Sequence, residues 1–129
     1  MKLNPTRKNA GLTLIEVTLV VAVLLGLIGV IFIGATSYKE GSNRSMCILH
    51  ISQVQKAVRA HQNMYQRNFG DSCPQSVLVG SGRMLEVAPS CPSGGEYTWL
   101  GTIPTLDTAY LTCSLATSHD HKPLNTLGW

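Results

Sequence analysis

The chain has few charged residues and few aromatic ones. Of its 129 residues, 13% are charged and 6% are aromatic, whereas soluble domains usually carry about 25% charged residues. The shortage is concentrated, because Glu16 is the only charged residue between Leu12 and Ala35. This distribution excludes a plain soluble globule and a disordered tail protein. The short length left outside this apolar run argues against a large enzyme.

Acidic residues are missing from the first eleven positions. The segment 1–11 contains Lys2, Arg7 and Lys8, and subtracting these three from the ten basic residues leaves seven, against seven acidic residues. The whole positive excess therefore precedes the apolar run, and the sequence predicts no surface for nucleic-acid binding. A basic cluster beside a membrane-length segment instead predicts that the N-terminus stays in the cytoplasm while the rest of the chain is exported.

Familiar catalytic and metal-binding motifs are also missing. The sequence has no Gly-x-Ser-x-Gly, no phosphate-binding loop, no His-Glu-x-x-His and no Cys-x-x-Cys. We therefore expect a protein that is not an enzyme, with no catalytic residue, no cofactor and no metal. His119 and His121 flank Asp120 and resemble metal ligands in spacing, but we interpret them as part of a solvated tail.

The apolar run, residues 12–35, is long enough to cross a membrane. At about 1.5 Å per residue it reaches ~36 Å, against ~30 Å for a hydrocarbon core. A removable secretory signal would be shorter and would end at a small-residue cleavage site. A simple anchor does not explain Glu16, because a carboxylate costs roughly 2.5–3.5 kcal/mol at mid-span and still costs free energy near the end of a span. No Lys or Arg lies between Glu16 and Lys39 to pair with it.

Proteolysis would supply a partner for this carboxylate. Cutting the Gly11–Leu12 bond creates an α-amine on Leu12 with a pKa of about 8, which is mostly protonated at neutral pH. That cation and Glu16 are four residues apart, so they are neighbours on one helical face. The same cut removes the basic leader, residues 1–11.

The segment from Lys8 to Val17, Lys-Asn-Ala-Gly-Leu-Thr-Leu-Ile-Glu-Val, followed by the apolar run, resembles the N-terminus of type IV pilins and pseudopilins. The resemblance implies cleavage after Gly11 by a prepilin peptidase, N-methylation of Leu12 by the same peptidase/methyltransferase, and a role for Glu16 in subunit assembly. Most family members have Phe at the first mature position, where this chain has Leu12. The close match covers roughly 30 residues.

The family resemblance also implies partners and locations. Sister subunits form a helical filament, and an assembly ATPase with its inner-membrane platform builds it. In the filament, the carboxylate of Glu16 is expected to pair with the amine of Leu12 in a neighbouring subunit, although pairing within one chain remains an alternative. The subunit resides in the cytoplasmic membrane before assembly, with its C-terminal domain outside the cytoplasm, and afterwards in a surface filament or a periplasmic pseudopilus.

The exported part, residues 36–129, begins with a polar segment in which Gly41 and Asn43 make a kink plausible. An amphipathic helix is expected over about 44–68, ending near Gly70 as C-cap. Its apolar stripe recurs at spacings of four and three residues, typical of one helical face: Cys47, Ile51, Val54, Val58, His61 and Tyr65.

Helical periodicity fades from Asp71 onward. Segments 72–79 and 83–87 fit either short helical turns or loops, while 96–101 and 109–115 are rich in Tyr, Trp, Thr and Leu and are predicted to be strands. The predicted fold class is α+β and pilin-like. A long N-terminal helix, transmembrane in its first half and amphipathic in its second, packs on a small antiparallel β-sheet.

Four cysteines are expected to staple this small domain, because export implies an oxidising compartment. Three pairings are open. We favour Cys91–Cys113, which flank the predicted hairpin, and Cys47–Cys73, which would tie the helix to the following loop. The segment 91–98 with Cys113-Ser114 and His121-Lys122-Pro123 resembles the C-terminal part of a group of small cysteine-containing bacterial pilins. The missing Cys-x-x-Cys argues against zinc.

The sequence thus favours a structural subunit of a type IV pilus-like filament, made as a precursor and polymerised through its apolar helix. Within this class, a minor pilin or a type II secretion pseudopilin is an alternative to a major pilin. From another class, a monomeric, single-span, membrane-anchored binding module is the rival interpretation. Processing by a prepilin peptidase discriminates between the two classes.

Overall fold

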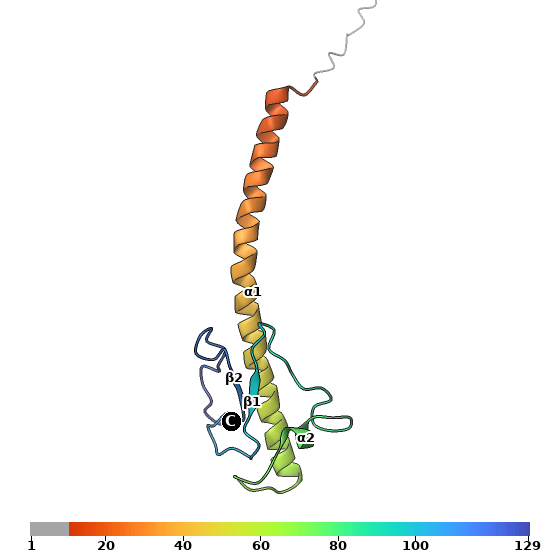
Figure 1. Ribbon diagram of the computed structural model, residues 1–129, viewed down its shortest axis with the longest axis vertical. Coiled ribbons are helices and arrows are strands. Elements are labelled where there is room, and N and C mark those ends of the chain that lie inside the picture. Colours follow the sequence, from red (N-terminus) through yellow and green to blue (C-terminus); the bar gives the residue numbers. More distant parts are fainter. Residues whose placement is uncertain (1–10) are drawn as a thin grey trace, which may run out of the picture. The chain divides into compact units, whose positions relative to one another are not determined.

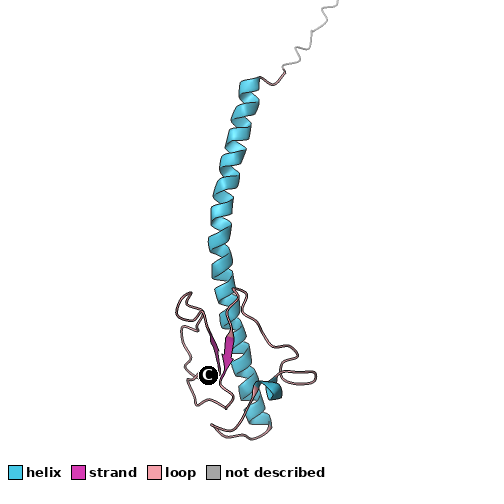
Figure 2. Cartoon of the chain, viewed as in Figure 1, coloured by secondary structure: helices cyan, strands magenta, loops and turns pink. Residues whose placement is uncertain are grey.

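The computed structural model of the chain describes residues 11–129, which divide into two compact units. The first unit ends at Ser37 and the second comprises Tyr38–Trp129. In chain order the elements are helix α1 (Leu14–Met64), the single helical turn α2 (Gln75–Leu78), and strands β1 (Tyr97–Trp99) and β2 (Leu111–Cys113) (Figures 1 and 2). The layout is α+β, as predicted.

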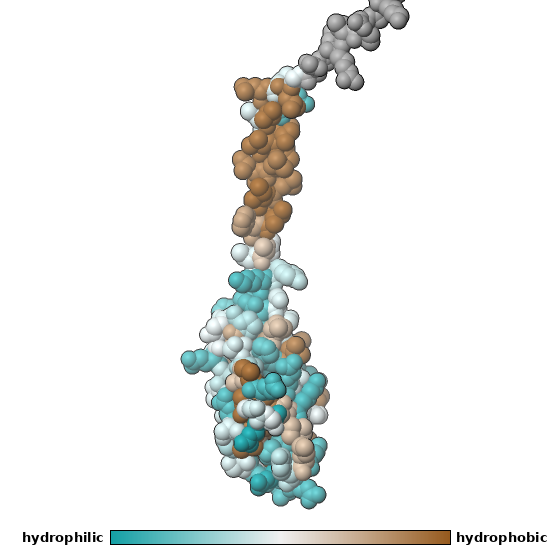
Figure 3. All heavy atoms as spheres, turned by 90° about the vertical axis from the view of Figure 1, so that its right-hand side faces the viewer, coloured by the Kyte–Doolittle hydropathy of each residue, from teal (hydrophilic) through white to brown (hydrophobic). Residues whose placement is uncertain are grey.

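In its described part, residues 11–37, the first unit consists mostly of the N-terminal part of α1, and the side chains there are exposed. The most apolar 18-residue window of the helix has a mean hydropathy of 2.9, and none of it is buried. Figure 3 shows this stretch as a continuous hydrophobic surface. The helix is thus long and apolar enough to cross a membrane. It is assigned without a break through Gly41 and Asn43, where we considered a kink.

The second unit buries one face of α1, as the apolar stripe predicts. Five of the six stripe residues are buried, namely Cys47, Ile51, Val54, Val58 and His61. The sixth, Tyr65, lies just beyond the helix and is 60% exposed. The spacing of apolar side chains therefore identified the buried face correctly until the helix ended.

The helix ends earlier than expected, at Met64 instead of near Gly70. Gln66 adopts a left-handed backbone with φ of 50°, and the Arg67 N–H donates to the Gln62 carbonyl at 2.9 Å. This is the hydrogen bond of a Schellman-type ending, made here without glycine. Gly70 instead donates its N–H to the Ile103 carbonyl at 2.9 Å, so tertiary pairing draws residues 66–70 away from the helix axis.

The strands are antiparallel, in the register Tyr97↔Cys113, Thr98↔Thr112 and Trp99↔Leu111. Each is shorter than predicted, although hydrogen bonds from Leu100 N–H to the Tyr110 carbonyl and from Ser114 N–H to the Glu96 carbonyl extend the pairing by one residue at each end. The buried face of α1 and β2 belong to one apolar core. The sheet is therefore covered by the helix, as expected for the second unit.

A buried amide fixes the sheet to the helix. Gln55 is 3% exposed, its Oε1 accepts the Tyr110 N–H at 2.8 Å, and its Nε2 donates to the Thr108 carbonyl at 3.2 Å. The carbonyl and N–H preceding β2 thereby obtain partners that the two-stranded sheet cannot provide. This contact sets the position of the strand on which Cys113 lies.

Candidate functional site

The predicted cleavage and assembly residues lie at the start of the described chain. Gly11 and Leu12 precede α1 and are exposed, and Leu12 retains 75% of its accessible surface. Thr13 acts as the N-cap, since its carbonyl accepts the N–H groups of Glu16 and Val17 at 3.1 and 3.2 Å, and its Oγ1 lies 3.4 Å from the Glu16 nitrogen. The Gly11–Leu12 bond therefore belongs to a non-helical, accessible segment. The basic leader up to residue 10 lies outside the described residues.

Glu16 occupies the first turn of α1, where a carboxylate is favoured by the helix dipole. Within residues 11–129, no basic group lies within ion-pair distance of its carboxylate. The side chain is exposed in the single chain. It is thus accessible to a cation from outside the described residues.

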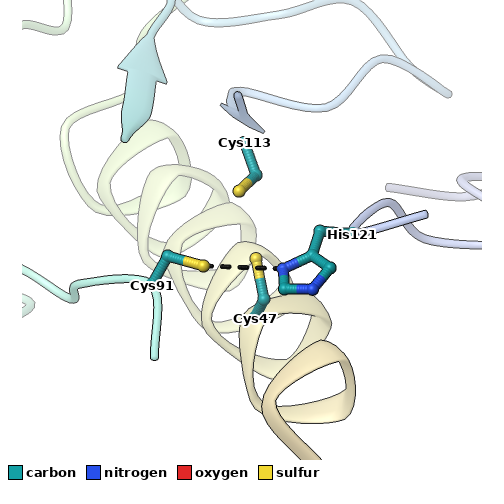
Figure 4. A group of neighbouring side chains, drawn as sticks. All are labelled: Cys47, Cys91, Cys113 and His121. Carbon is teal, nitrogen blue, oxygen red and sulfur yellow. Dashed lines mark hydrogen bonds between the residues drawn. The ribbon is translucent and has the colours of Figure 1, made fainter. Parts of the chain in front are cut away.

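A second group of chemically active side chains lies in the second unit (Figure 4). We call it the thiol–imidazole cluster, and it consists of Cys47, Cys91, Cys113 and His121. Cys47 projects from the buried face of α1, Cys91 from the loop before β1, and Cys113 from the last position of β2. The sequence separates these residues widely, and only the folded chain brings them together.

The cluster is compact and buried. Its four ligand-type atoms, three sulfurs and one imidazole nitrogen, all lie within 4.8 Å of one another, and all four residues are buried. Cys91 Sγ and His121 Nδ1 are 3.5 Å apart. Their side chains point toward a common centre from the helix, the loop, the strand and the C-terminal segment (Figure 4).

The environment treats the thiols differently. Burial raises the pKa of the Cys91 thiol, but hydrogen bonds from the backbone N–H groups of Ser93 and Gly95, together with contacts to His121 and Cys113, outweigh burial and lower that pKa to about 7. Burial raises the pKa of Cys47 to about 12, although the hydrogen bond from the Tyr97 hydroxyl at 3.3 Å acts in the opposite direction. One thiol of the cluster is therefore prepared to carry a negative charge near neutral pH.

His121 is oriented by a carboxylate. Its Nε2 lies 3.2 Å from Oε1 of Glu40 on α1, and Oε2 of Glu40 accepts a hydrogen bond from the Ser93 hydroxyl at 3.3 Å. With Nε2–H donating to Glu40, the lone pair of Nδ1 points toward the sulfur of Cys91. The neighbouring ion pair between Arg44 and Asp120, at 2.6 Å, holds the adjoining residue to the same helix.

The interpretation of His119 and His121 as one solvated tail is wrong for His121, which has no accessible surface. Asp120 adopts a left-handed conformation with φ of 56°, and the His121 N–H then returns to the Leu115 carbonyl at 3.2 Å. His119 remains exposed and contacts the Ser118 hydroxyl. The two imidazole rings stay close, with centroids 6.2 Å apart in an edge-to-face contact, but the turn buries His121 and leaves His119 exposed.

The fourth cysteine lies elsewhere. Cys73 is buried beside His61, with Sγ 4.0 Å from Nδ1, and its carbonyl accepts a hydrogen bond from the Tyr110 hydroxyl. All four cysteines are free thiols in the structure, and Cys47 lies with Cys91 and Cys113 instead of with Cys73. The Cys91–Cys113 pairing stays a prediction, and the sulfurs of these two residues are neighbours.

Sequence reasoning treated the cysteines as two pairs and missed the cluster. The signal that could have found it is the hairpin itself, because antiparallel pairing brings the residues before β1 close to the end of β2. Comparison of the chain with protein-family models, with curated proteins and with solved structures finds no match. The resemblance to pilins therefore rests on the N-terminal residues and the short C-terminal pattern alone.

Proposed function

We propose that this protein is an exported, membrane-anchored structural subunit that is cleaved after Gly11 and polymerises through α1 into a pilus-like filament. The observation that carries the proposal is the unburied apolar surface of the first unit, which begins directly after an accessible Gly11–Leu12 bond and contains one acidic residue, Glu16. Such a surface requires a covering, which lipid supplies before assembly and neighbouring helices supply afterwards.

Cleavage after Gly11 changes the charges at the start of this apolar surface. Hydrolysis of the Gly11–Leu12 bond removes the basic leader and leaves a protonated amine next to an exposed carboxylate. Inside a bundle of apolar helices, an unpaired Glu16 would be expensive, and pairing with the amine of Leu12 in an adjacent subunit lowers that cost. Such a pair fixes the axial position of one helix against the next.

The implied partners follow from the same steps. A prepilin peptidase/methyltransferase cuts and modifies the chain, sister subunits form the filament, and an assembly ATPase with its membrane platform extracts subunits from the bilayer. The exported unit, Tyr38–Trp129, forms the filament surface. Its folded core supports a role outside the membrane, because it buries its own apolar residues without help from lipid.

The proposal is tested by expressing the full chain in bacterial membranes with and without a prepilin peptidase. We expect the mature chain to begin at Leu12, as determined by N-terminal sequencing and intact mass, only when the peptidase is present. Gly11→Val should leave the chain uncut because the family's peptidase cuts after Gly. Gly26→Val is the matched control: an added Cβ meets no atom within 4 Å there, so processing should persist.

Two results would contradict the proposal. A chain that keeps its first eleven residues in the presence of the peptidase is a monomeric anchored module and not a pilin-like subunit. A chain that is cut but yields no fibres in sheared surface material, examined by electron microscopy, is not a filament subunit.

A further inference from the structure

The thiol–imidazole cluster has no part in processing or polymerisation, yet it lies at the centre of the exported unit. It joins α1, the loop before β1, the end of β2 and the C-terminal segment. Apart from these residues, the core is a small apolar cluster around one helix face and two short strands. A domain of this kind commonly depends on disulfides or a structural metal for stability.

The residue types and spacing fit a closed tetrahedral zinc site. Three thiolates and one imidazole form one of the standard ligand sets of structural Zn²⁺. With metal–sulfur and metal–nitrogen bonds of about 2.3 and 2.0 Å, tetrahedral ligands lie roughly 3.5–3.8 Å apart. The separation of Cys91 Sγ and His121 Nδ1 is 3.5 Å, and no pair of the four atoms exceeds 4.8 Å. Only a small contraction would bring all four into bonding range.

The surroundings supply the outer contacts that a zinc site uses. Glu40 accepts from Nε2 of His121 at 3.2 Å, which leaves Nδ1 free to bind metal, as in the carboxylate–histidine–zinc arrangement. The Tyr97 hydroxyl donates to Cys47 Sγ at 3.3 Å, and backbone N–H groups of Ser93 and Gly95 donate to the sulfur of Cys91. Hydrogen bonds to sulfur stabilise the negative charge of metal-bound thiolates.

The local backbone is shaped for the same purpose. Gly94 has φ of 78°, a conformation that side chains disfavour, and a Cβ added at Gly95 would lie 2.9 Å from Cys113 Sγ. The two glycines therefore let the loop after Cys91 turn sharply and approach the sulfur of Cys113 closely. The need for glycine at these two positions is an observation separate from the distances between the four ligand atoms.

We propose that the exported unit binds one Zn²⁺ through the four residues of the thiol–imidazole cluster, and that this ion staples the helix to the loops and the sheet. Binding of Zn²⁺ displaces the thiol protons to solvent, so the site becomes three thiolates, a neutral imidazole and one dication, with a net charge of −1. No electrons are transferred. Zinc explains all four side chains together, whereas one disulfide among three cysteines leaves a buried thiol and an unused imidazole.

The experiment uses the full chain, purified in detergent without chelator and without added reductant. We expect about one zinc per chain by elemental analysis. Replacement of the zinc by Co²⁺ should give the visible absorption of a tetrahedral thiolate site. Chelator should remove the ion and lower the thermal unfolding midpoint of the exported unit, followed by the fluorescence of the two tryptophans, Trp99 and Trp129, both of which lie in that unit.

Matched variants assign the ligands. Cys113→Ser and His121→Ala should each lose the bound metal, whereas Cys73→Ser and His119→Ala replace the same residue types outside the cluster and should retain it. Glu40→Gln should keep the site but weaken zinc affinity by about 10–100-fold. The control variants show whether metal is lost on any Cys or His replacement. The Glu40 variant leaves every ligand in place, so a weaker zinc affinity in that variant reports on the site and not on a missing ligand.

Wild-type protein alone can overturn the proposal. If the purified chain contains no zinc, does not bind Co²⁺, and has an intact mass lowered by the two hydrogens of a disulfide that involves a cluster cysteine, the site is oxidised and not metallated. Equal zinc content in the Cys113 and His121 variants would likewise exclude this cluster as the site. Either result leaves the cleavage and filament proposal unaffected.

Discussion

At the scale of single residues, Gly94 and Gly95 in the loop after Cys91 show how the absence of a side chain can determine a loop's conformation. Gly94 supplies the left-handed turn, and Gly95 supplies the space into which the sulfur of Cys113 fits. An alanine methyl at position 95 would also lie 3.0 Å from Cγ of Leu115. Contacts this short force a neighbour to move, and the neighbour that moves is a proposed metal ligand.

We therefore predict that Gly95→Ala reduces both zinc content and thermal stability. Overpacking of this kind costs about 1–3 kcal/mol, and displacement of Cys113 weakens the site further. Elemental analysis and thermal unfolding of the detergent-solubilised chain measure the two effects. Gly41→Ala is the matched control, because an added Cβ there meets no atom within 4 Å and the residue is helical. A Gly95 variant that matches the Gly41 variant in both measurements would contradict the close packing described here.

The sequence identified the candidate residues at the N-terminus but not the grouping of the cluster residues. Glu16 stood out because a charge in an apolar run has few explanations, and its position depends only on local chain order. His121 was noted for its metal-ligand spacing but was interpreted as solvated, because its burial depends on a left-handed turn at Asp120 and on contact with Glu40 on a distant part of the chain. Local patterns carry no information on such contacts.

At the scale of elements, α1 illustrates both what periodicity predicts and where it fails. Apolar spacing identified the buried face from Cys47 to His61, because burial along one helix follows its repeat. The end of the helix was expected near Gly70 as C-cap, whereas Gln66 turns the chain and Gly70 pairs with Ile103. Helix ends depend on competing tertiary hydrogen bonds, so the sequence located the face but not the boundary.

The attachment of the sheet to α1 depends on Gln55, and we predict that Gln55→Leu destabilises the second unit. Leucine has a similar size but leaves the Tyr110 N–H and the Thr108 carbonyl without their partner. The Tyr110 N–H is buried, and leaving such a group unpaired costs roughly 1–3 kcal/mol, whereas the carbonyl of the exposed Thr108 can turn to water. Urea unfolding followed by tryptophan fluorescence measures the loss.

Gln53→Leu provides the control for this prediction. Gln53 lies on the same helix, is exposed, and undergoes the same chemical change, so its effect should stay within about 0.5 kcal/mol. Equal unfolding midpoints for the two variants would show that the buried amide does not hold the sheet to the helix.

At the scale of the whole molecule, the two units differ in whether their apolar residues are buried. The second unit, Tyr38–Trp129, buries its own apolar residues and gathers three of its thiols and one imidazole in an internal cluster. The first unit leaves its apolar residues exposed and carries one acidic side chain. The C-terminal unit is therefore a self-contained fold, whereas the apolar surface of the first unit needs other molecules to cover it. Assembly is expected to depend on the N-terminal helix and not on the thiol–imidazole cluster.

This division predicts the behaviour of Glu16→Gln. The variant keeps the size of the side chain but removes the charge that would pair with the amine of Leu12 in a neighbouring subunit. We expect normal cleavage after Gly11, normal residence in the membrane and an unchanged zinc content, but at least tenfold fewer filaments, since about 1.4 kcal/mol per contact already changes an association constant tenfold. Electron microscopy of sheared surface material counts the filaments.

Glu86→Gln is the control, because it removes a charge from an exposed loop of the other unit and should not reduce the number of filaments. Filament numbers equal to those of the unaltered chain would exclude the carboxylate of Glu16 from assembly, even if cleavage after Gly11 is confirmed.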